Sequence, residues 1–531
     1  MPNIYSDTSV LDPNSDGKWA EFPDPPVQDE VLDWWFRLQD DLLSEARGVY
    51  FTTMTKKDLI GSDAERQVDL LLKAKGEGGS RNNHNWKDVR VVGELKQSEQ
   101  EIRSKNTVLQ ISRYVRDIFT AQPTRRFVHA FAVCGTKMET WVFDRSGPYS
   151  SGVLDVYKDP ERFFQVILGY AMMSDEELGL NTFTTQNGDG ARTITVERAE
   201  SGEETVLRLD PAPLCSQPAI VCRGMSCFLA KDGDKMEAVA KFSWTSDKRR
   251  PEVDLLKLAR QRGVKGVARV IGHSAITSVT DMRDGLTFDN RYTFRSAAPS
   301  TTSSFTQSHS HNPLSQSFTQ LRGLELLTAL RDSIKAHRSL YLDRKILYRD
   351  ISENNIIITN PEKAEGSSGM LIDLDLGKEI GTRSGARHQT GTIEFMAIEV
   401  LLNVDHTYQH DLESFFYVLI WQCGRHGWRF SGNPRDQPKD SLLTKWYTGT
   451  FRDITQIKQS DMGASEFEDI LKEFPLQFDS IKPLCRELQR LFFSIYDGDI
   501  FTGTPVGPKK MYGPIIQAFD KAIHDIKAAE A

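Results

Sequence analysis

Two thirds of the way along the chain, residues 346–355 read Ile-Leu-Tyr-Arg-Asp-Ile-Ser-Glu-Asn-Asn. This run places a carboxylate, Asp350, five positions before a carboxamide, Asn355. Ile346 and Leu347 stand ahead of its polar residues and three isoleucines follow at 356–358, so the pattern predicts a polar loop ahead of a short buried strand. Phosphoryl transfer uses such a pair, because the Asp orients the attacking hydroxyl and the Asn holds a metal ion. The motif is short, and alone it is a weak signal.

Three downstream elements come after this loop in an informative order. Residues 370–375, Met-Leu-Ile-Asp-Leu-Asp, bring a second carboxylate, Asp373, to the end of an apolar strand, where it is suited to bind metal. Residues 391–400, Gly-Thr-Ile-Glu-Phe-Met-Ala-Ile-Glu-Val, have the pattern that closes the activation segment of protein kinases. Asp411 then opens a nearly all-apolar run to Cys423, which predicts a buried helix.

With these elements in this order, residues from about 205 to 531 resemble a protein kinase domain. The pattern Arg-Asp-Ile-Ser-x-x-Asn followed by Leu-Ile-Asp-x-Asp is similar to the fungal-type protein kinase family, which usually carries a separate domain ahead of the kinase domain. The resemblance implies an α+β class, with a bilobal protein kinase-like fold preceded by a separate α/β N-terminal domain. It also implies that ATP and Mg²⁺ are used. The roles it implies in the loop are Asp350 as base, with Asn355 and Asp373 as Mg²⁺ ligands.

The small kinase lobe is expected to begin near residue 213. Strands are predicted at 219–222 and 227–230, on either side of a loop that contains Gly224. By resemblance this is the loop that covers the nucleotide phosphates, and Gly224 is its one glycine where three are usual. Fewer backbone N–H groups can then approach the phosphates closely, which weakens the expected grip on ATP.

The run Glu-Ala-Val-Ala-Lys-Phe at 237–242 reads as the next strand. Its Lys241 fits the strand lysine that holds the α- and β-phosphates in kinases. An amphipathic helix begins after Pro251, and Glu252 on this helix is the expected ion-pair partner of Lys241, with Asp254 as the alternative. A lysine at a strand end that simply reaches into solvent is the competing interpretation.

Four positions depart from the kinase pattern. Tyr348 stands where a His is usual, and Ile398 replaces the Pro of Ala-Pro-Glu. Ser352 replaces the Lys that steadies the transferring phosphate, and the loss of one such charge donor typically costs about 2–4 kcal/mol. Asp375 replaces Gly in the metal-binding triplet, and reading the triplet as residues 375–377 is an alternative to Asp373.

The leading functional hypothesis is ATP-dependent phosphorylation of Ser or Thr hydroxyls on a protein substrate. Small-molecule kinases share the loop motif but usually lack an activation segment, so residues 391–399 favour a protein substrate. A catalytically weak scaffold that uses the kinase fold to bind partners is the main alternative, supported by the sparse glycine loop and Ser352. Arg349 is suited to read a phosphate on the activation segment. The candidate phosphorylation sites there are Thr382, Ser384, Thr390 and Thr392.

A second set of polar residues lies far upstream. Asp69, then Glu94 and Lys96 in a predicted strand, and then Gln110 and Tyr114 on one helix face resemble the PD-(D/E)xK nuclease fold. In that fold the two acids hold a metal and the Lys positions the attacking water. The alternative is that Glu94 and Lys96 are the solvent face of a half-buried strand. Asp69 also lacks the preceding Pro of the pattern.

The 531 residues are too many for one core. We expect a disordered tail over 1–27, the N-terminal domain over 28–200 and the kinase-like domain over 205–531. Ser and Thr make up half of residues 296–319, which predicts a disordered insertion there.

Composition sets further limits. The formal net charge of −8 argues against binding dominated by a nucleic-acid backbone. The six cysteines show no metal-ligand spacing or disulfide framework. Because the cysteines form no disulfide framework, we expect a reducing intracellular compartment, cytoplasmic or nuclear. No run is long enough to span a bilayer. The sequence does not fix the oligomeric state.

Overall fold

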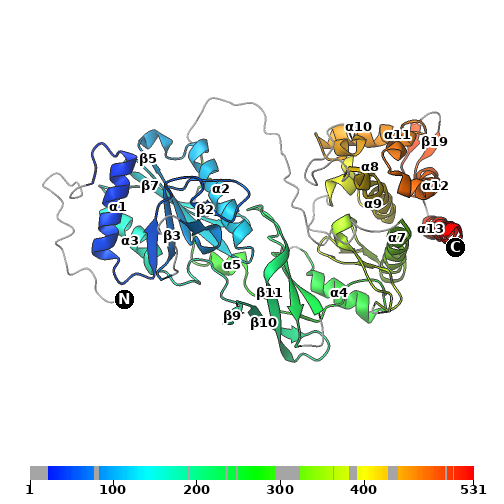
Figure 1. Cartoon of the computed structure of the whole chain (residues 1–531), viewed down its shortest axis with the longest axis horizontal. Helices are drawn as coiled ribbons and strands as arrows, with labels where there is room; N and C mark the ends of the chain where they lie inside the picture. Colours follow the sequence, from blue (N-terminus) through cyan, green and yellow to red (C-terminus); the bar gives the residue numbers. More distant parts are fainter. Residues whose placement is uncertain are drawn as a thin grey trace.

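The chain folds into an N-terminal α/β domain, a small lobe and a largely helical large lobe (Figure 1). The structure is a computed structural model and describes residues 22–76, 83–188, 190–233, 237–246, 249–288, 290–294, 323–362, 364–381, 391–428, 441–496, 499–505 and 507–530. Within these ranges helices and sheets are mixed, which confirms the predicted α+β class. No helix in them combines the length and the apolar character needed to cross a bilayer.

The N-terminal domain is built on one mixed sheet of six strands. Its order is β1-β3-β5-β6-β7-β8, and only β5 and β6 are parallel. Helix α2 (Lys105–Ala121) connects these two strands, as a parallel crossover requires. Gly93 lets them pack, because a Cβ there would lie 2.2 Å from the ring of Phe131. The strands are β1 (Gly48–Phe51), β3 (Leu70–Ala74), β5 (Val91–Lys96), β6 (Phe127–Cys134), β7 (Lys137–Asp144) and β8 (Gly147–Asp155), with β2 (Leu59–Ile60) and β4 (His84–Asn85) paired beside them.

Two apolar cores cover the two faces of this sheet. Helix α2 packs on one face, and helices α1 (Gln28–Leu42) and α3 (Pro160–Met172) pack on the other. Trp35 of α1 stacks on Phe131 at 5.6 Å between ring centroids. Phe22 is also buried, at 5.0 Å from Trp34. Phe22 thus belongs to the folded domain although the expected tail extended to residue 27; the rest of that tail, 1–21, lies outside the described residues.

The small lobe is a second sheet in the order β13-β12-β11-β10-β14. Its first strands start before residue 205, where the sequence interpretation began the kinase domain, because β10 pairs with β11 along its length. The strand expected at 219–222 is absent: β11 ends at Ser216, and the backbone carbonyl of Ala219 bonds to the N-terminal domain instead of to β12. The strands are β9 (Thr185–Gln186), β10 (Arg192–Arg198), β11 (Glu204–Ser216), β12 (Ser226–Lys231), β13 (Glu237–Phe242) and β14 (Gly272–His273).

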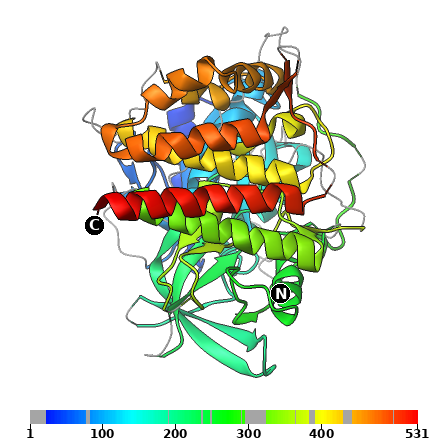
Figure 2. The same cartoon turned by 90° about the vertical axis from the view of Figure 1, so that its right-hand side faces the viewer.

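The large lobe surrounds one extensive apolar core. Its central helix α9 (Tyr408–Trp428) is buried over the predicted apolar run, and α7 (Gly323–Arg338) lies beside the C-terminal α13 (Lys509–Glu530) (Figure 2). Helix α4 (Glu252–Gln261) of the small lobe packs into the same core. The remaining elements are β15 (Ile346–Leu347), β16 (Ile356–Ile358), β17 (Gly369–Leu371), β18 (Lys378–Glu379), α8 (Ile398–Leu401), α10 (Phe451–Asp461), α11 (Glu466–Lys472), α12 (Lys482–Phe492), β19 (Ser494–Tyr496) and β20 (Asp499–Phe501).

The segment after β14 returns to the N-terminal domain. It contains the short helix α5 (Val279–Met282), which is drawn beside that domain in Figure 1. Arg283 donates to Asp144 at 2.7 Å, and the Tyr292 hydroxyl donates to Glu139 at 3.4 Å. The small lobe is thereby joined to the N-terminal domain through side-chain contacts. The predicted insertion at 296–319 lies outside the described residues.

Candidate functional site

Lys241 and Glu252 face each other from β13 and α4. Lys241 Nζ lies 2.6 Å from Glu252 Oε2, and both side chains are largely withdrawn from solvent. The local sequence explains the geometry, because Lys241 is next to the last residue of its strand and Pro251 caps the first turn of α4. Of the two acids considered on this helix, Glu252 is the one paired with Lys241.

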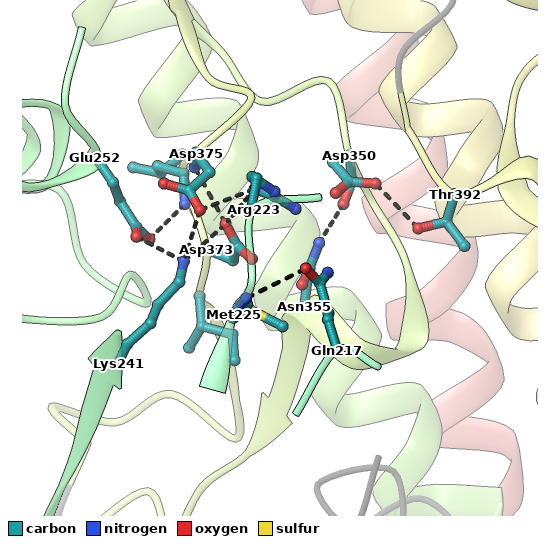
Figure 3. A network of polar contacts seen from close by, with 12 residues as sticks. Gln217, Arg223, Met225, Lys241, Glu252, Asp350, Asn355, Asp373, Asp375 and Thr392 are labelled. Atoms are coloured by element: carbon teal, nitrogen blue, oxygen red, sulfur yellow. Dashed lines mark hydrogen bonds and ion pairs between the residues drawn. The ribbon is translucent and has the colours of Figure 1, made fainter. Parts of the chain in front are cut away.

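Asp373 and Asp375 both reach the same lysine (Figure 3). Asp373 Oδ1 lies 3.0 Å and Asp375 Oδ2 3.1 Å from Lys241 Nζ. Together with Glu252 they form what we call the carboxylate cluster, whose ligand atoms lie within 4.8 Å of one another. The sequence interpretation treated the two aspartates as alternatives, whereas the structure brings them together.

The backbone after β17 makes this possible. Asp373 has φ +64°, in the left-handed region that bends the chain sharply. The N–H of the next residue, Leu374, donates to Glu252 Oε1 at 2.8 Å, which fixes the turn against α4. Asp373 and Asp375 therefore project to the same side although they are only two residues apart.

The charged groups of this cluster shift one another's pKa values. Burial alone would raise the pKa of Asp373, but Lys241 and Arg223 hold that pKa below its ordinary value. Burial likewise would lower the pKa of Lys241, and the surrounding carboxylates keep it above the ordinary value instead. Asp373 and Lys241 are thus held in their charged forms. Asp375 Oδ1 is buried and has no hydrogen-bond donor within the described part of the chain.

The Asp-Asn loop (residues 348–355) lies across from the cluster (Figure 3). Asn355 Nδ2 donates to the backbone oxygen of Asp350 at 2.8 Å, and Thr392 Oγ1 donates to Asp350 Oδ1 at 3.0 Å. Burial, and then the charge of Asp373, raise the pKa of Asp350 to about 6. At neutral pH this carboxylate is ionised and closer in basicity to water-exposed histidine than an ordinary Asp is.

Tyr348 connects the loop to the segment between β17 and Asp373. Its ring is fully buried and its hydroxyl donates to the carbonyl of Ile372. The aromatic ring thus occupies the space beneath the metal-binding segment, where the resemblance expects a His. Ser352 is also buried, and its neutral hydroxyl cannot supply the cation that a Lys at that position would carry.

Gly224 serves a contact that the sequence did not reveal. It has φ +55°, and a Cβ there would lie 2.6 Å from Nε of Arg145 in the N-terminal domain. Its lack of a side chain allows Arg145 to approach, and its assignment to phosphate binding stays a prediction. Of the proposed phosphorylation sites, Thr392 bonds to Asp350, while Thr382, Ser384 and Thr390 lie outside the described residues. Arg349, the residue expected to bind a phosphate on the activation segment, is buried and 6% exposed.

Arg223 is the site residue that sequence reasoning missed. Its Nη1 lies 2.8 Å from Asp375 Oδ2 and 3.6 Å from Asp373 Oδ1. The one available signal was an arginine directly before the single glycine of the loop. Nothing in the sequence shows that its side chain turns toward the cluster.

A second polar group forms in the N-terminal domain from the residues of the nuclease-like pattern. Asp69 accepts from the backbone N–H of Leu95 at 2.8 Å, and Lys96 donates to Glu94 and, at 3.3 Å, to Gln110. Gln110 in turn donates to the hydroxyl of Tyr114 at 2.7 Å, a contact within one face of α2. The five residues are therefore neighbours.

Glu94 is the most buried member of this group. It is 1% exposed, and its Oε2 finds no hydrogen-bond donor among the described residues. Burial, and then the charge of Asp69, raise the pKa of Glu94 to about 7, although Lys96 opposes this shift. A solvent-facing position for Glu94, the alternative considered from the sequence, is excluded. Whether the group works as a nuclease site stays a prediction.

A comparison with protein families agrees with this geometry. The family profile described as fungal protein kinase matches residues 67–423, more than half of the chain. The match begins just ahead of Asp69 in the N-terminal domain and ends within α9, so the family pattern includes the region of both polar groups. No curated protein matches the chain significantly. Because the profile match spans the small lobe, the Asp-Asn loop and the carboxylate cluster, the chain belongs to the fungal protein kinase family.

Proposed function

We propose that this chain is an ATP- and Mg²⁺-dependent protein kinase that phosphorylates Ser or Thr hydroxyls on protein substrates. The observation that carries the proposal is the convergence of two groups from distant parts of the chain (Figure 3). Lys241 and the carboxylate cluster lie on one side, and Asp350 with Asn355 lies on the other. Phosphoryl transfer needs both groups at once.

The donor set fits a hard divalent cation. Asp373, Asp375 and Asn355 offer oxygen ligands of the kind that Mg²⁺ prefers. Asp375 Oδ1, buried without a donor within the described ranges, is a ligand atom still available for coordination. When bound, Mg²⁺ would neutralise charge on the nucleotide phosphates.

The protein groups have separate tasks in this proposal. Glu252 orients Lys241, whose ammonium group holds the α- and β-phosphates. Asp350 orients the substrate hydroxyl and takes its proton, and the raised pKa of about 6 brings its basicity closer to the working pH. Thr392 donates to Asp350 and so marks where the activation segment meets the base.

The end of the activation segment supports a protein substrate. His410 Nε2 lies 2.8 Å from Glu399 Oε2, and Lys458 Nζ donates to the carbonyls of Glu394 and Met396 at 2.7 and 2.8 Å. These contacts fasten residues 393–399 to the large lobe. A fastened segment gives a polypeptide substrate a surface to lie on beside Asp350.

The catalytically weak scaffold remains the second candidate. A specific observation favours it, because Arg223 pairs with the carboxylates that the proposal assigns to Mg²⁺. The buried Ser352 removes a further cation from the phosphate path. The two candidates differ in whether nucleotide binding depends on a metal ion.

Thermal unfolding of the full chain with ATP, with and without Mg²⁺, separates them. The kinase proposal expects a Mg²⁺-dependent rise in melting temperature that Asp373→Asn abolishes. Asp520→Asn, at an exposed position on α13, is the matched control. No shift at millimolar ATP would favour the scaffold. Transfer of labelled phosphate to mixed protein substrates, followed by phosphoamino-acid analysis, then tests the Ser/Thr assignment.

A further inference from the structure

Arg223 stands in a loop that is held at both ends. The β11–β12 loop (residues 217–225) closes where the backbone N–H of Gln217 donates to the carbonyl of Met225 at 2.9 Å. Trp244, beyond β13, donates its N–H to the carbonyl of Arg223 itself at 2.7 Å. The side chain of Arg223 is 27% exposed and points inward (Figure 3). It is therefore positioned by the backbone and is not a free surface arginine.

The N-terminal domain supports this loop from behind. Arg145, in the turn between β7 and β8, donates to the carbonyl of Ala219 at 2.7 Å. Its guanidinium lies over the ring of Phe119 at 3.9 Å, and the side chain is 5% exposed. Ile220 of the loop packs against the apolar core of the same domain. Gly224 admits Arg145 at a distance that no larger residue would allow.

The guanidinium of Arg223 lies between the two halves of the site. It pairs with Asp375 at 2.8 Å, and its charge also acts on Asp350 across the site. The path of a transferring phosphoryl group runs between the metal ligands and the base. Ser352 supplies no cation along that path, whereas the guanidinium of Arg223 lies beside it (Figure 3).

Carboxylates outnumber cations in this region. The charges of Glu252, Asp373, Asp375 and Asp350 act on Arg223, and the other cations of this region are Lys241 and Arg249. A divalent cation bound at Asp373 and Asp375 would repel Arg223 and release its guanidinium. A guanidinium fork matches two phosphate oxygens as well as it matches a carboxylate.

We propose that Arg223 is a second phosphate-binding cation of this kinase beside Lys241, and that it exchanges Asp375 for the terminal phosphates of the nucleotide when the divalent cation binds. The inference rests on the proposed kinase function and deepens it. In this proposal the side chain of Arg223 takes the place of the glycine backbone N–H groups that the β11–β12 loop lacks. Its charge also replaces the lysine charge that is absent at Ser352. The opposite role is a cation that blocks the metal ligands.

The test is calorimetric titration of the full chain with ATP and with AMP, each in Mg²⁺, for the wild type, Arg223→Met and Arg223→Lys. Because only ATP carries the terminal phosphates, Arg223→Met should weaken ATP binding at least tenfold and AMP binding less than threefold. Arg223→Lys keeps the charge without the fork and should fall between. Arg250→Met, an exposed arginine paired with Glu379, is the matched control and should bind like the wild type.

Each other outcome would contradict either the inference about Arg223 or the proposed kinase function. If Arg223→Met binds ATP as well as the wild type, the inference is wrong while the kinase proposal stands. Tighter binding by Arg223→Met would identify Arg223 as a blocking cation. If the wild type binds neither nucleotide, the proposed function itself fails. Should Arg223→Met not fold, as judged by its melting transition, Arg223→Lys with the same ATP-to-AMP ratio decides the question.

Discussion

Asp411 collects hydrogen bonds from three parts of the large lobe although it is fully buried. Its carboxylate accepts from the backbone N–H groups of Tyr348 and Arg349 at 3.1 and 2.9 Å. His337 and His406 each place a ring nitrogen within about 3 Å of it. Burial would raise its pKa, but the two histidines hold the pKa below its ordinary value. The ionised carboxylate therefore anchors the Asp-Asn loop to α9.

Replacing Asp411 by Asn should destabilise the chain by about 3 kcal/mol at pH 7, because a buried charge network loses its centre. The pKa of Asp411 is lower in the folded than in the unfolded state. Its contribution is therefore present above about pH 4 and is lost as the pH falls through the acid range. Urea unfolding of Asp411→Asn and wild type at several pH values should show a difference that shrinks below pH 4.

Asp520→Asn is the control for this comparison, since Asp520 lies half exposed on α13 and should change stability by less than about 0.5 kcal/mol. Equal urea midpoints for Asp411→Asn and wild type at pH 7 would show that the loop is held by other contacts.

In the N-terminal domain, the pKa of Glu94 is shifted in the opposite direction from that of Asp411. Its pKa of about 7 exceeds the unfolded value, so the folded state keeps a proton that the unfolded chain releases. Stability then falls as the pH rises from about 4 to about 7. Glu94→Gln should gain about 2 kcal/mol over the wild type at pH 8 and nearly nothing at pH 4.5. Thermal unfolding at both pH values measures this, with the exposed Glu161→Gln as control.

The same variants test the predicted metal site. If Asp69 and Glu94 hold a divalent ion, Mn²⁺ should raise the melting temperature of the wild type and leave that of Glu94→Gln unchanged. A loss of stability in Glu94→Gln at pH 8 would instead indicate a structural ion pair with Lys96.

Helix α10 fastens the activation segment through one buried lysine. Lys458 donates to the carbonyls of Glu394 and Met396 and lies over the ring of Tyr417 at 4.1 Å. Burial lowers the pKa of Lys458 to about 7. Between about pH 7 and 10 the unfolded chain binds a proton that the folded chain does not. This group therefore makes stability rise with pH in that range.

Lys458→Met should cost about 2 kcal/mol and remove this rise with pH, because both carbonyls lose their donor. Hydrogen exchange of residues 393–402 should accelerate about tenfold or more, as the segment loses its attachment. Lys472→Met on α11, at a side chain 76% exposed, is the matched control. Unchanged exchange in Lys458→Met would mean that Glu399 and His410 suffice to hold the segment.

Hydrophobic periodicity in the sequence predicted the helices whose formation depends on neighbouring residues in the chain. The all-apolar run after Asp411 became α9, and the amphipathic run after Pro251 became α4. The strand expected at 219–222 is absent, and the carbonyl of Ala219 accepts instead from Arg145, more than seventy positions away in the chain. Periodicity cannot report such a partner.

The residues of the candidate site fall into the same two groups, those that a local sequence pattern indicates and those that depend on tertiary contacts. Lys241, Asp350, Asn355 and Asp373 could be proposed from the sequence because each lies near the end of a predicted strand or in a motif of fixed spacing. The joint use of Asp373 and Asp375 depends on one left-handed residue, and the inward turn of Arg223 depends on a loop held by Trp244. Both are tertiary facts that a spacing pattern does not contain.

One turn of the N-terminal domain makes two polar contacts with later parts of the chain, besides the bond from Tyr292 to Glu139. Arg145 holds the β11–β12 loop, and the neighbouring Asp144 accepts from Arg283 in the segment after β14. Arg283 also lies over the ring of Tyr149 at 5.0 Å. One turn of the N-terminal domain thus contacts both the loop that carries Arg223 and the segment that leads toward the large lobe.

This arrangement predicts that a residue outside the kinase lobes controls nucleotide affinity. Arg145→Met keeps the apolar contact with Phe119 but removes the donor to Ala219, so the β11–β12 loop should lose its support and Arg223 its position. The affinity of the full chain for Mg²⁺-ATP should fall about five- to tenfold, a coupling energy of about 1–1.4 kcal/mol. Calorimetric titration measures it.

Arg283→Met separates loop support from a general loosening of the two domains, because it breaks the second contact and leaves the loop in place. Its affinity for Mg²⁺-ATP should stay within twofold of the wild type. An equal loss in both variants would mean that the domain interface acts as one unit. Wild-type affinity in Arg145→Met would mean that Trp244 and Gln217 alone position Arg223, and the N-terminal domain would then have no part in nucleotide binding.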